Sequence, residues 1–304
     1  MKPAMTHSAA LELIEERTFS ARLNGHTVTG LQVAGTWEGL TKFHHPASSL
    51  HLIVRDSDKR LVDGSPTLMF ALGLTEGGNE HFVLVPETLL PNGTLVPAFL
   101  YARYPASKGD DGKLQLSPSA KPWVNVSYRE AVAACADAGY QLARETQELA
   151  IRLNVVNQPG NWTGGAVGAG QVYQGLHLGK VSSAQAADFV SPEADERSWH
   201  VLSTGERVYG LAGNIHTWVF DDVQGDADGI VARRFDERSL SLVTPPYGSR
   251  QCGMGWRPDA DANWSGRALV RGGYWNDGDY AGVFSLLSGS PDIRSGDVGF
   301  RCTK

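Results

Sequence analysis

Short runs of hydrophobic residues, separated by turn-forming residues, characterise the first part of the chain. The segments 50–54 and 67–72 have the length and the residue types of β-strands. Asp63-Gly64 and Gly77-Gly78-Asn79 supply the conformational freedom that turns between strands require. We therefore predict a small β-rich N-terminal domain over residues 1–85, followed by a larger domain over residues 86–304.

The larger domain carries two patterns typical of helices. Ser127 and Glu130 have the spacing of a capping box, which begins a helix that we expect to run to about Ala138 and to end at Gly139. A second helix is predicted over 145–155, where apolar residues recur at helical spacing. A Pro-Asn-Gly turn at 91–93 and a strand over 94–101 precede both, and Gly-rich stretches follow. The expected fold class is α+β, with two helices, short antiparallel strands and long loops.

Composition and charge exclude several functional classes. The 304 residues are 41% hydrophobic and 20% charged, which suffices for a folded core. The net charge of -6 is not organised into Lys/Arg runs, so no nucleic-acid partner is expected. Glu12, Glu15 and Glu16 interrupt the only N-terminal stretch that could serve as a signal peptide or a membrane span. We expect no membrane insertion, and a location in a virion or in the cytoplasm stays open.

The C-terminal third resembles a known enzyme family. Residues 267–276 and 291–302 resemble the terminal signature of the formylglycine-generating-enzyme (sulfatase-modifying factor) family, and the Gly-Asn-Ile-His-Thr-Trp sequence of 213–218 resembles its Gly-Asn-Val-Trp-Glu-Trp element. With weaker matches at 124–127 and 139–142, the resemblance covers roughly residues 90–304. It implies a C-type lectin fold of the formylglycine-generating-enzyme type. The fold alone does not determine the function.

The catalytic residues of that family are missing. Its catalytic members bind copper through two cysteines, and the matching positions here are Asp277 and Gly282. The resemblance therefore implies no catalytic residue, no metal ligand and no enzyme. The family's calcium-binding Glu corresponds to Thr217, so calcium stays unassigned, although the acidic residues downstream could substitute.

A closer resemblance is to the variable proteins of diversity-generating retroelements, whose motifs are similar to 158–165 and 272–284. In those systems, copying errors at adenines rewrite chosen codons, often Asn codons. Such changes cannot create Lys, Glu, Gln, Met or Trp. Residues 274–297 contain none of these except Trp275, which the motif treats as framework.

This resemblance implies a non-catalytic ligand- or receptor-binding protein with a hypervariable surface at 274–297, used in phage tropism or in surface display. We expect outward-facing ligand contacts at Tyr274, Asp277, Asp279, Tyr280, Ser285, Leu287, Ser288, Gly289, Ser290, Ile293 and Gly296. The expected framework consists of Gly272, Gly273, Trp275, Phe284, Asp292, Arg294, Gly299, Phe300 and Arg301, with Asp292 and Arg294 as an internal ion pair.

Two further expectations follow from the resemblance. Cys135 and Cys302 should be neighbours and could form a disulfide, whereas Cys252 should be unpaired. The partner would be a protein or a glycan of variable identity, bound by a homo-oligomer or by a phage tail component. The alternatives are an enzyme of the same fold with altered metal chemistry and a calcium-dependent carbohydrate-binding lectin.

Overall fold

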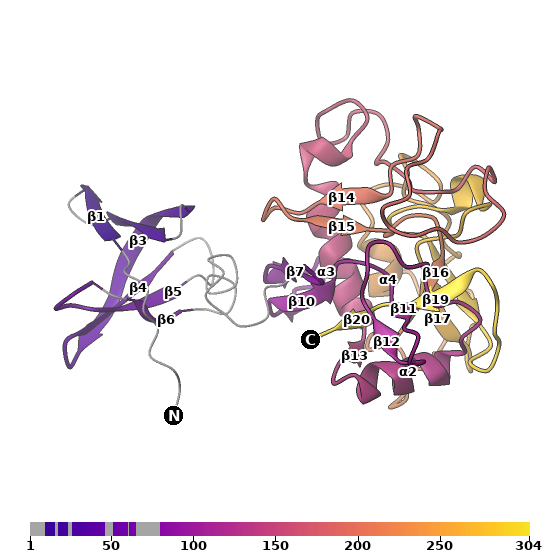
Figure 1. Cartoon of the computed structure of the whole chain (residues 1–304), viewed down its shortest axis with the longest axis horizontal. Coiled ribbons are helices and arrows are strands. Elements are labelled where there is room, and N and C mark those ends of the chain that lie inside the picture. Colours follow the sequence, from indigo (N-terminus) through magenta and orange to yellow (C-terminus); the bar gives the residue numbers. More distant parts are fainter. Residues whose placement is uncertain (1–9, 16–17, 24–25, 46–50, 60, 65–79) are drawn as a thin grey trace. The chain divides into compact units, whose positions relative to one another are not determined.

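The computed structural model describes residues 10–15, 18–23, 26–45, 51–59, 61–64 and 80–304 (Figure 1). Backbone contacts divide the chain into one unit over Met1–Asn79 and a second over Glu80–Lys304. The division falls near residue 80 because Phe82–Val85, which the sequence pattern assigned to the N-terminal part, pairs with Phe99–Ala102 of the second unit.

The first unit contains a six-stranded antiparallel meander in which each strand pairs with the next along the chain. Its buried apolar residues include Phe43 and Leu52 on adjacent strands. The strand expected over 50–54 is β5, whereas the one expected over 67–72 lies outside the described residues. The strands are β1 (Ala10–Glu15), β2 (Thr18–Leu23), β3 (His26–Trp37), β4 (Leu40–His44), β5 (His51–Arg55) and β6 (Leu61–Gly64).

The second unit is mostly β-structure with few helices. One four-stranded sheet has the order β13-β20-β10-β7 and another the order β18-β17-β16-β19. In the second sheet β16 and β19 are parallel, which differs from the expected all-antiparallel arrangement. The strands are β7 (Phe82–Val85), β8 (Thr88–Leu89), β9 (Leu95–Val96), β10 (Phe99–Ala102), β11 (Ser107–Lys108), β12 (Leu114–Gln115), β13 (Gln141–Leu142), β14 (Trp199–Val201), β15 (Arg207–Tyr209), β16 (His216–Val219), β17 (Ala268–Arg271), β18 (Leu286–Gly289), β19 (Val298–Phe300) and β20 (Cys302–Thr303).

Local signals place the two longer helices. In α2 (Tyr128–Asp137), Ser127 and Glu130 form the expected capping box, and Gly139 follows with φ of 75°. α3 (Glu145–Val156) ends one residue beyond the prediction. A short α4 (Leu240–Val243) and the 3₁₀ turns η1 (Pro159–Asn161) and η2 (Gly278–Tyr280) complete the helical segments of the described chain. The strand expected over 94–101 is divided into β9 and β10 around Pro97, whose nitrogen carries no hydrogen to donate.

The core of the second unit connects the helices to the C-terminal strands. One hydrophobic cluster joins α3 to Val283 and Phe284, and another joins α2 to Trp218 and Phe300.

Cys135 and Cys302 are neighbours within the second cluster, as expected, and both are free thiols. The hydrogen bond with the Cys302 thiol, together with burial, raises the pKa of Cys135, which therefore stays protonated. Among the described residues, no helix is long and apolar enough to span a membrane.

Candidate functional site

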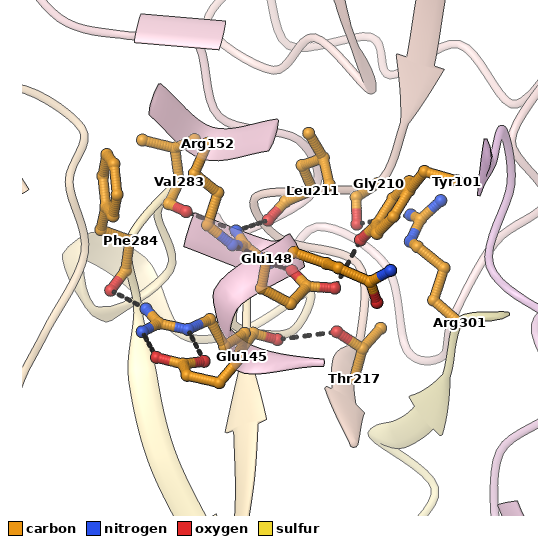
Figure 2. Close-up of polar contacts among 12 residues, drawn as sticks. Tyr101, Glu145, Glu148, Arg152, Gly210, Leu211, Thr217, Val283, Phe284 and Arg301 are labelled. Atoms are coloured by element: carbon orange, nitrogen blue, oxygen red, sulfur yellow. Dashed lines mark hydrogen bonds and ion pairs between the residues drawn. The ribbon is translucent and has the colours of Figure 1, made fainter. Parts of the chain in front are cut away.

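Two carboxylates of α3 lie at the centre of a buried polar network beneath the expected variable segment (Figure 2). Glu148 accepts hydrogen bonds from the Tyr101 hydroxyl at 2.6 Å and from Arg152 Nε at 3.0 Å. Glu145 accepts a hydrogen bond from Arg271 Nε at 2.9 Å. The four charged side chains are at most 1% exposed. Since each buried charge has an opposite partner, the network is electrostatically satisfied.

The two arginines of this network also bind main-chain carbonyls, including two of the 274–297 segment. Arg152 Nη1 donates to the carbonyls of Leu211, at 2.9 Å, and of Val283. Arg271 Nη1 donates to the Phe284 carbonyl at 3.1 Å (Figure 2). These contacts hold the backbone at 283–284 through carbonyl groups, which every residue type provides.

A second set of main-chain bonds fixes the same stretch from its other side. Val283 N–H donates to Gly253 O at 3.1 Å, and Phe284 N–H donates to Met254 O at 2.8 Å. The two segments approach so closely that a Cβ added at Gly282 would lie 2.1 Å from the nitrogen of Gly255. Only glycine therefore fits at position 282.

The expected ligand contacts differ widely in exposure. Tyr280 and Ile293 are 37% and 48% exposed. Ser285 is fully buried, so its assignment as an outward-facing contact is wrong. After Ala281 the chain turns inward, which buries Phe284. Ser285 is buried with it because Gly255 packs against its side chain, so closely that a Cβ at Gly255 would lie 2.8 Å from Cβ of Ser285. The exposed positions are Asp279, Tyr280, Ser290, Ile293 and Gly296, and the half-buried ones are Tyr274, Asp277, Leu287, Ser288 and Gly289.

Tyr274 and Asp277 lie against His216, which the sequence analysis treated only as part of a motif. The His216 and Tyr274 ring centroids are 5.5 Å apart, and His216 Nε2 lies 3.4 Å from Asp277 Oδ2. Burial lowers the pKa of His216 to about 4, although Asp297 opposes the shift. Burial, with a smaller contribution from Asp297, raises the pKa of Asp277 to about 6. Both groups are thus shifted toward their neutral forms.

Tyr280 and Asp279 lie on an aromatic and charged surface. Their neighbours on this surface, Arg250, Trp256 and Trp264, were not among the predicted site residues. The Tyr280 ring is stacked with Trp256 at 6.0 Å between centroids, and Trp256 is stacked with Trp264 at 6.5 Å. The Arg250 guanidinium carbon lies 3.9 Å from the Tyr280 ring centroid, and Arg250 Nη1 lies 3.9 Å from Asp279 Oδ2. The sequence analysis did not predict these partners of Tyr280 and Asp279. The tryptophans of the Gly-rich region were the only sequence feature that could have indicated an aromatic surface there.

The C-terminal part of the segment makes other contacts. Arg267 Nε donates to the Ser288 hydroxyl at 2.8 Å, and Leu287 packs against the cluster that contains Trp218. A Cβ at Gly289 would lie 2.8 Å from the Trp218 ring and 3.5 Å from Ile293. Apart from Ser285 and Gly296, the predicted ligand residues therefore fall into two groups of contacts, 274–280 and 287–293.

The framework residues are buried or half-buried, except Asp292 and Arg294, which are exposed. Phe284 and Phe300 are fully buried, Arg301 is 1% exposed and Trp275 is half-buried. Gly272 and Gly273, with φ of 100° and 87°, and Gly299 are buried as well.

The internal ion pair expected between Asp292 and Arg294 is wrong. Asp292 accepts a hydrogen bond from Arg129 at 3.2 Å, and Arg294 binds Glu130 at 2.7 Å, on an exposed surface. A main-chain hydrogen bond from Tyr128 N–H to Pro291 O holds the start of α2 beside the loop that carries Asp292 and Arg294.

Clusters of metal-binding side chains are absent from the described residues. No group of three or more His, Cys, Asp or Glu side chains that could hold a metal ion occurs among them. Thr217, at the position of the family's calcium-binding Glu, donates to Arg271 O at 3.4 Å. Asp221, one of the acidic residues considered as a substitute, is fully buried, and burial raises its pKa to about 6.

No protein-family model matches the chain, and no curated protein matches it. Three similar solved structures have low identity. Treponema denticola variable protein 1 has a TM-score of 0.39 and 14% identity, over 73% of this chain and 93% of its own. PvdO from Pseudomonas aeruginosa has a TM-score of 0.35 and 15% identity, over 73% and 93%. The Major Tropism Determinant M1 variant has a TM-score of 0.35 and 11% identity, over 97% and 82%. Similarities at this level identify no ligand and no activity for this chain.

Proposed function

We propose that the second unit is a C-type lectin-like domain of the formylglycine-generating-enzyme type, which displays residues 274–297 as a ligand-binding surface. The protein would then be a non-enzymatic receptor-binding protein whose surface a retroelement diversifies. The first unit, in this proposal, is an appendage to the binding domain.

The observation that carries the proposal is the anchoring of the backbone at 283–284. Buried Arg152 and Arg271 hold two carbonyls, and main-chain bonds from 253–254 hold two amide groups. None of these bonds depends on the side chains at Asp279, Tyr280 or Ile293, which are exposed. A surface that accepts many sequences requires a backbone of this kind, because its shape must survive each substitution.

The ligand class expected for such a surface is a protein or a glycan. Tyr274 and Tyr280 offer large amphipathic contact areas at low conformational-entropy cost, as tyrosines do in antibody paratopes. Display in several copies on an oligomer or a phage tail would convert weak single-site binding into strong avidity.

Comparison of this gene between closely related isolates tests the proposal. We expect substitutions at Asp279, Tyr280, Ser290 and Ile293, confined to adenine positions of the codons, and a near-identical template repeat beside the gene. Codons for Phe284 and Gly282 should stay unchanged. A constant 274–297 segment without a template repeat would refute retroelement diversification.

A stability measurement tests the division between displayed and framework residues. Because their side chains are exposed, replacing Asp279, Ser290 and Ile293 together by Ala should change the free energy of unfolding by only about 1 kcal/mol. Phe284→Ala, at a fully buried ring, should cost about 3–5 kcal/mol. Equal losses in urea unfolding would contradict the division.

A further inference from the structure

The β14–β15 hairpin belongs to the second unit (Figure 1). A cavity of about 280 Å³ lies beside it, and no residue of the 274–297 segment lines this cavity. Its apolar lining includes Leu176, Ala187 and Phe189, and Trp199 and Tyr209 contribute aromatic rings. The volume is near the lower end of the range for small-molecule sites. The cavity could therefore hold a compact ligand with an apolar body.

Two arginines lie close over the Trp199 ring. The guanidinium carbon of Arg197 is 4.1 Å from the Trp199 centroid and 3.8 Å from that of Tyr173, and the Arg207 carbon is 4.0 Å from the Trp199 centroid. Two planar cations this close to one centroid cannot share a face of the ring, so Trp199 lies between them. Stacking on aromatic faces stabilises a guanidinium group while leaving its edge N–H groups available to bind an acceptor.

The hairpin geometry turns Arg207 toward the cavity. Trp199 pairs with Tyr209 and Val201 pairs with Arg207, so these four side chains share one face of the hairpin. The Arg207 carbonyl accepts a hydrogen bond from Arg103 Nη1 at 2.8 Å, which fixes the main chain at this point.

The cationic groups here have no carboxylate partner within the described chain. Arg197 donates only to neutral oxygens, those of Trp199, Gly160 and Asn161. The Arg207 guanidinium makes no hydrogen bond or ion pair with any described residue, although it lines the cavity. Burial, with a smaller contribution from Arg207, lowers the pKa of Arg197 to about 10. An anion bound here would relieve this repulsion.

The acidic residues of the cavity do not supply that anion. Glu196 already accepts hydrogen bonds from the Ser191 hydroxyl at 2.5 Å and from the His177 amide at 2.7 Å. Burial alone would raise its pKa, but these hydrogen bonds lower it, so Glu196 stays ionised and engaged. Asp188, like Arg207, is exposed, and no hydrogen bond or ion pair joins these two side chains in the described chain.

We propose that this cavity binds a small organic carboxylate with an apolar body, whose carboxylate pairs with the Arg207 guanidinium while its apolar part contacts Phe189 and Leu176. Guanidinium and carboxylate form paired, charge-assisted hydrogen bonds, which makes this anion a good geometric match. The site is independent of the proposed variable surface, since no residue of 274–297 lines the cavity.

Calorimetric titration of the full chain with 3-phenylpropionate, its uncharged amide and inorganic phosphate tests the inference. We expect saturable binding of the carboxylate, at least tenfold weaker binding of the amide, and weaker binding of phosphate. Equal binding of acid and amide, binding of phosphate alone, or no saturable binding of the carboxylate would overturn the proposal.

Arg207→Gln should weaken binding of the carboxylate at least tenfold, because it removes the charge but keeps the main chain that Arg103 holds. Arg234→Gln, at an exposed arginine that does not line the cavity, is the matched control and should leave binding unchanged. An Arg207→Gln protein that folds normally and binds the carboxylate as tightly as the unmodified protein would exclude Arg207 as the anchor and refute the inference.

Discussion

At the scale of single residues, Asp277 and His216 titrate abnormally in opposite directions. Burial raises the pKa of Asp277 from 3.8 to about 6, so Asp277 favours folding at low pH and loses that contribution as the pH rises from 3.8 through 6. Burial lowers the pKa of His216 from 6.5 to about 4, so the contribution of His216 is present above pH 6.5 and is lost as the pH falls through 4. The two effects oppose each other over nearly the same pH range.

Asp277→Asn separates these effects. At pH 7 the substitution removes a half-buried negative charge, and we expect the free energy of unfolding to rise by about 1–2 kcal/mol. This gain should shrink as the pH falls from 6 toward 4, where Asp277 of the folded protein becomes protonated. Urea unfolding at pH 7, 5 and 4 measures it, with the exposed Asp279→Asn as control. A gain that is the same at every pH would contradict this assignment.

At the scale of secondary-structure elements, α3 packs in the hydrophobic core and also contacts the 274–297 segment. Glu145, Glu148 and Arg152 recur at spacings of three and four residues, so they share a helix face. That face meets Arg271 and the carbonyl of Val283 (Figure 2). The helix thus positions the backbone at 283–284 as well as packing against the core.

Arg152→Met should destabilise the fold by about 3–5 kcal/mol, because it leaves the buried Glu148 without its cationic partner. In the double variant Glu148→Gln/Arg152→Met, the loss of unfolding free energy should be smaller than the sum of the losses in Glu148→Gln and in Arg152→Met. Arg144→Met, at the exposed N-cap of the same helix, should cost less than about 1 kcal/mol. Guanidinium denaturation of the four variants measures these values, and additive losses would show that the pair is not coupled.

At the scale of the whole molecule, the second unit has a complete core of its own. Three hydrophobic clusters that include Leu149, Trp218 and Phe235 take all their residues from Phe82 onward. The first unit buries other residues, such as Phe43 and Leu52, in its own meander. The physical basis for independent folding is therefore present in residues 80–304.

We expect a protein of residues 80–304 to unfold cooperatively, within a few degrees of the transition of the same unit in the full chain. Circular dichroism and two-dimensional amide NMR would measure this transition and the dispersion of the signals. Collapsed, poorly dispersed spectra would show that the second unit depends on the first. A fragment of residues 86–304, which lacks β7, is the informative comparison and should be less stable, because β10 loses one of its two partner strands and keeps only β20.

Features encoded by neighbouring residues could be predicted from the sequence. Ser127 with Glu130 predicted the start of α2, and Gly139 predicted its end, because capping and left-handed backbone conformations depend on residues a few positions apart. The exposure of Tyr280 and the burial of Phe300 agree with what the family resemblance of the C-terminal segment implied.

Features that depend on distant segments were decided only by the tertiary structure. Ser285 is buried because residues 253–256 pack against 280–286, and Arg294 pairs with Glu130 because α2 lies beside the C-terminal loop. The arginines stacked on Trp199 and the anchoring of Val283 by Arg152 likewise join residues that no local pattern connects. The sequence by itself thus determined local backbone conformation and the polarity of faces, whereas burial and charge pairing depended on which surfaces the folded chain brings into contact.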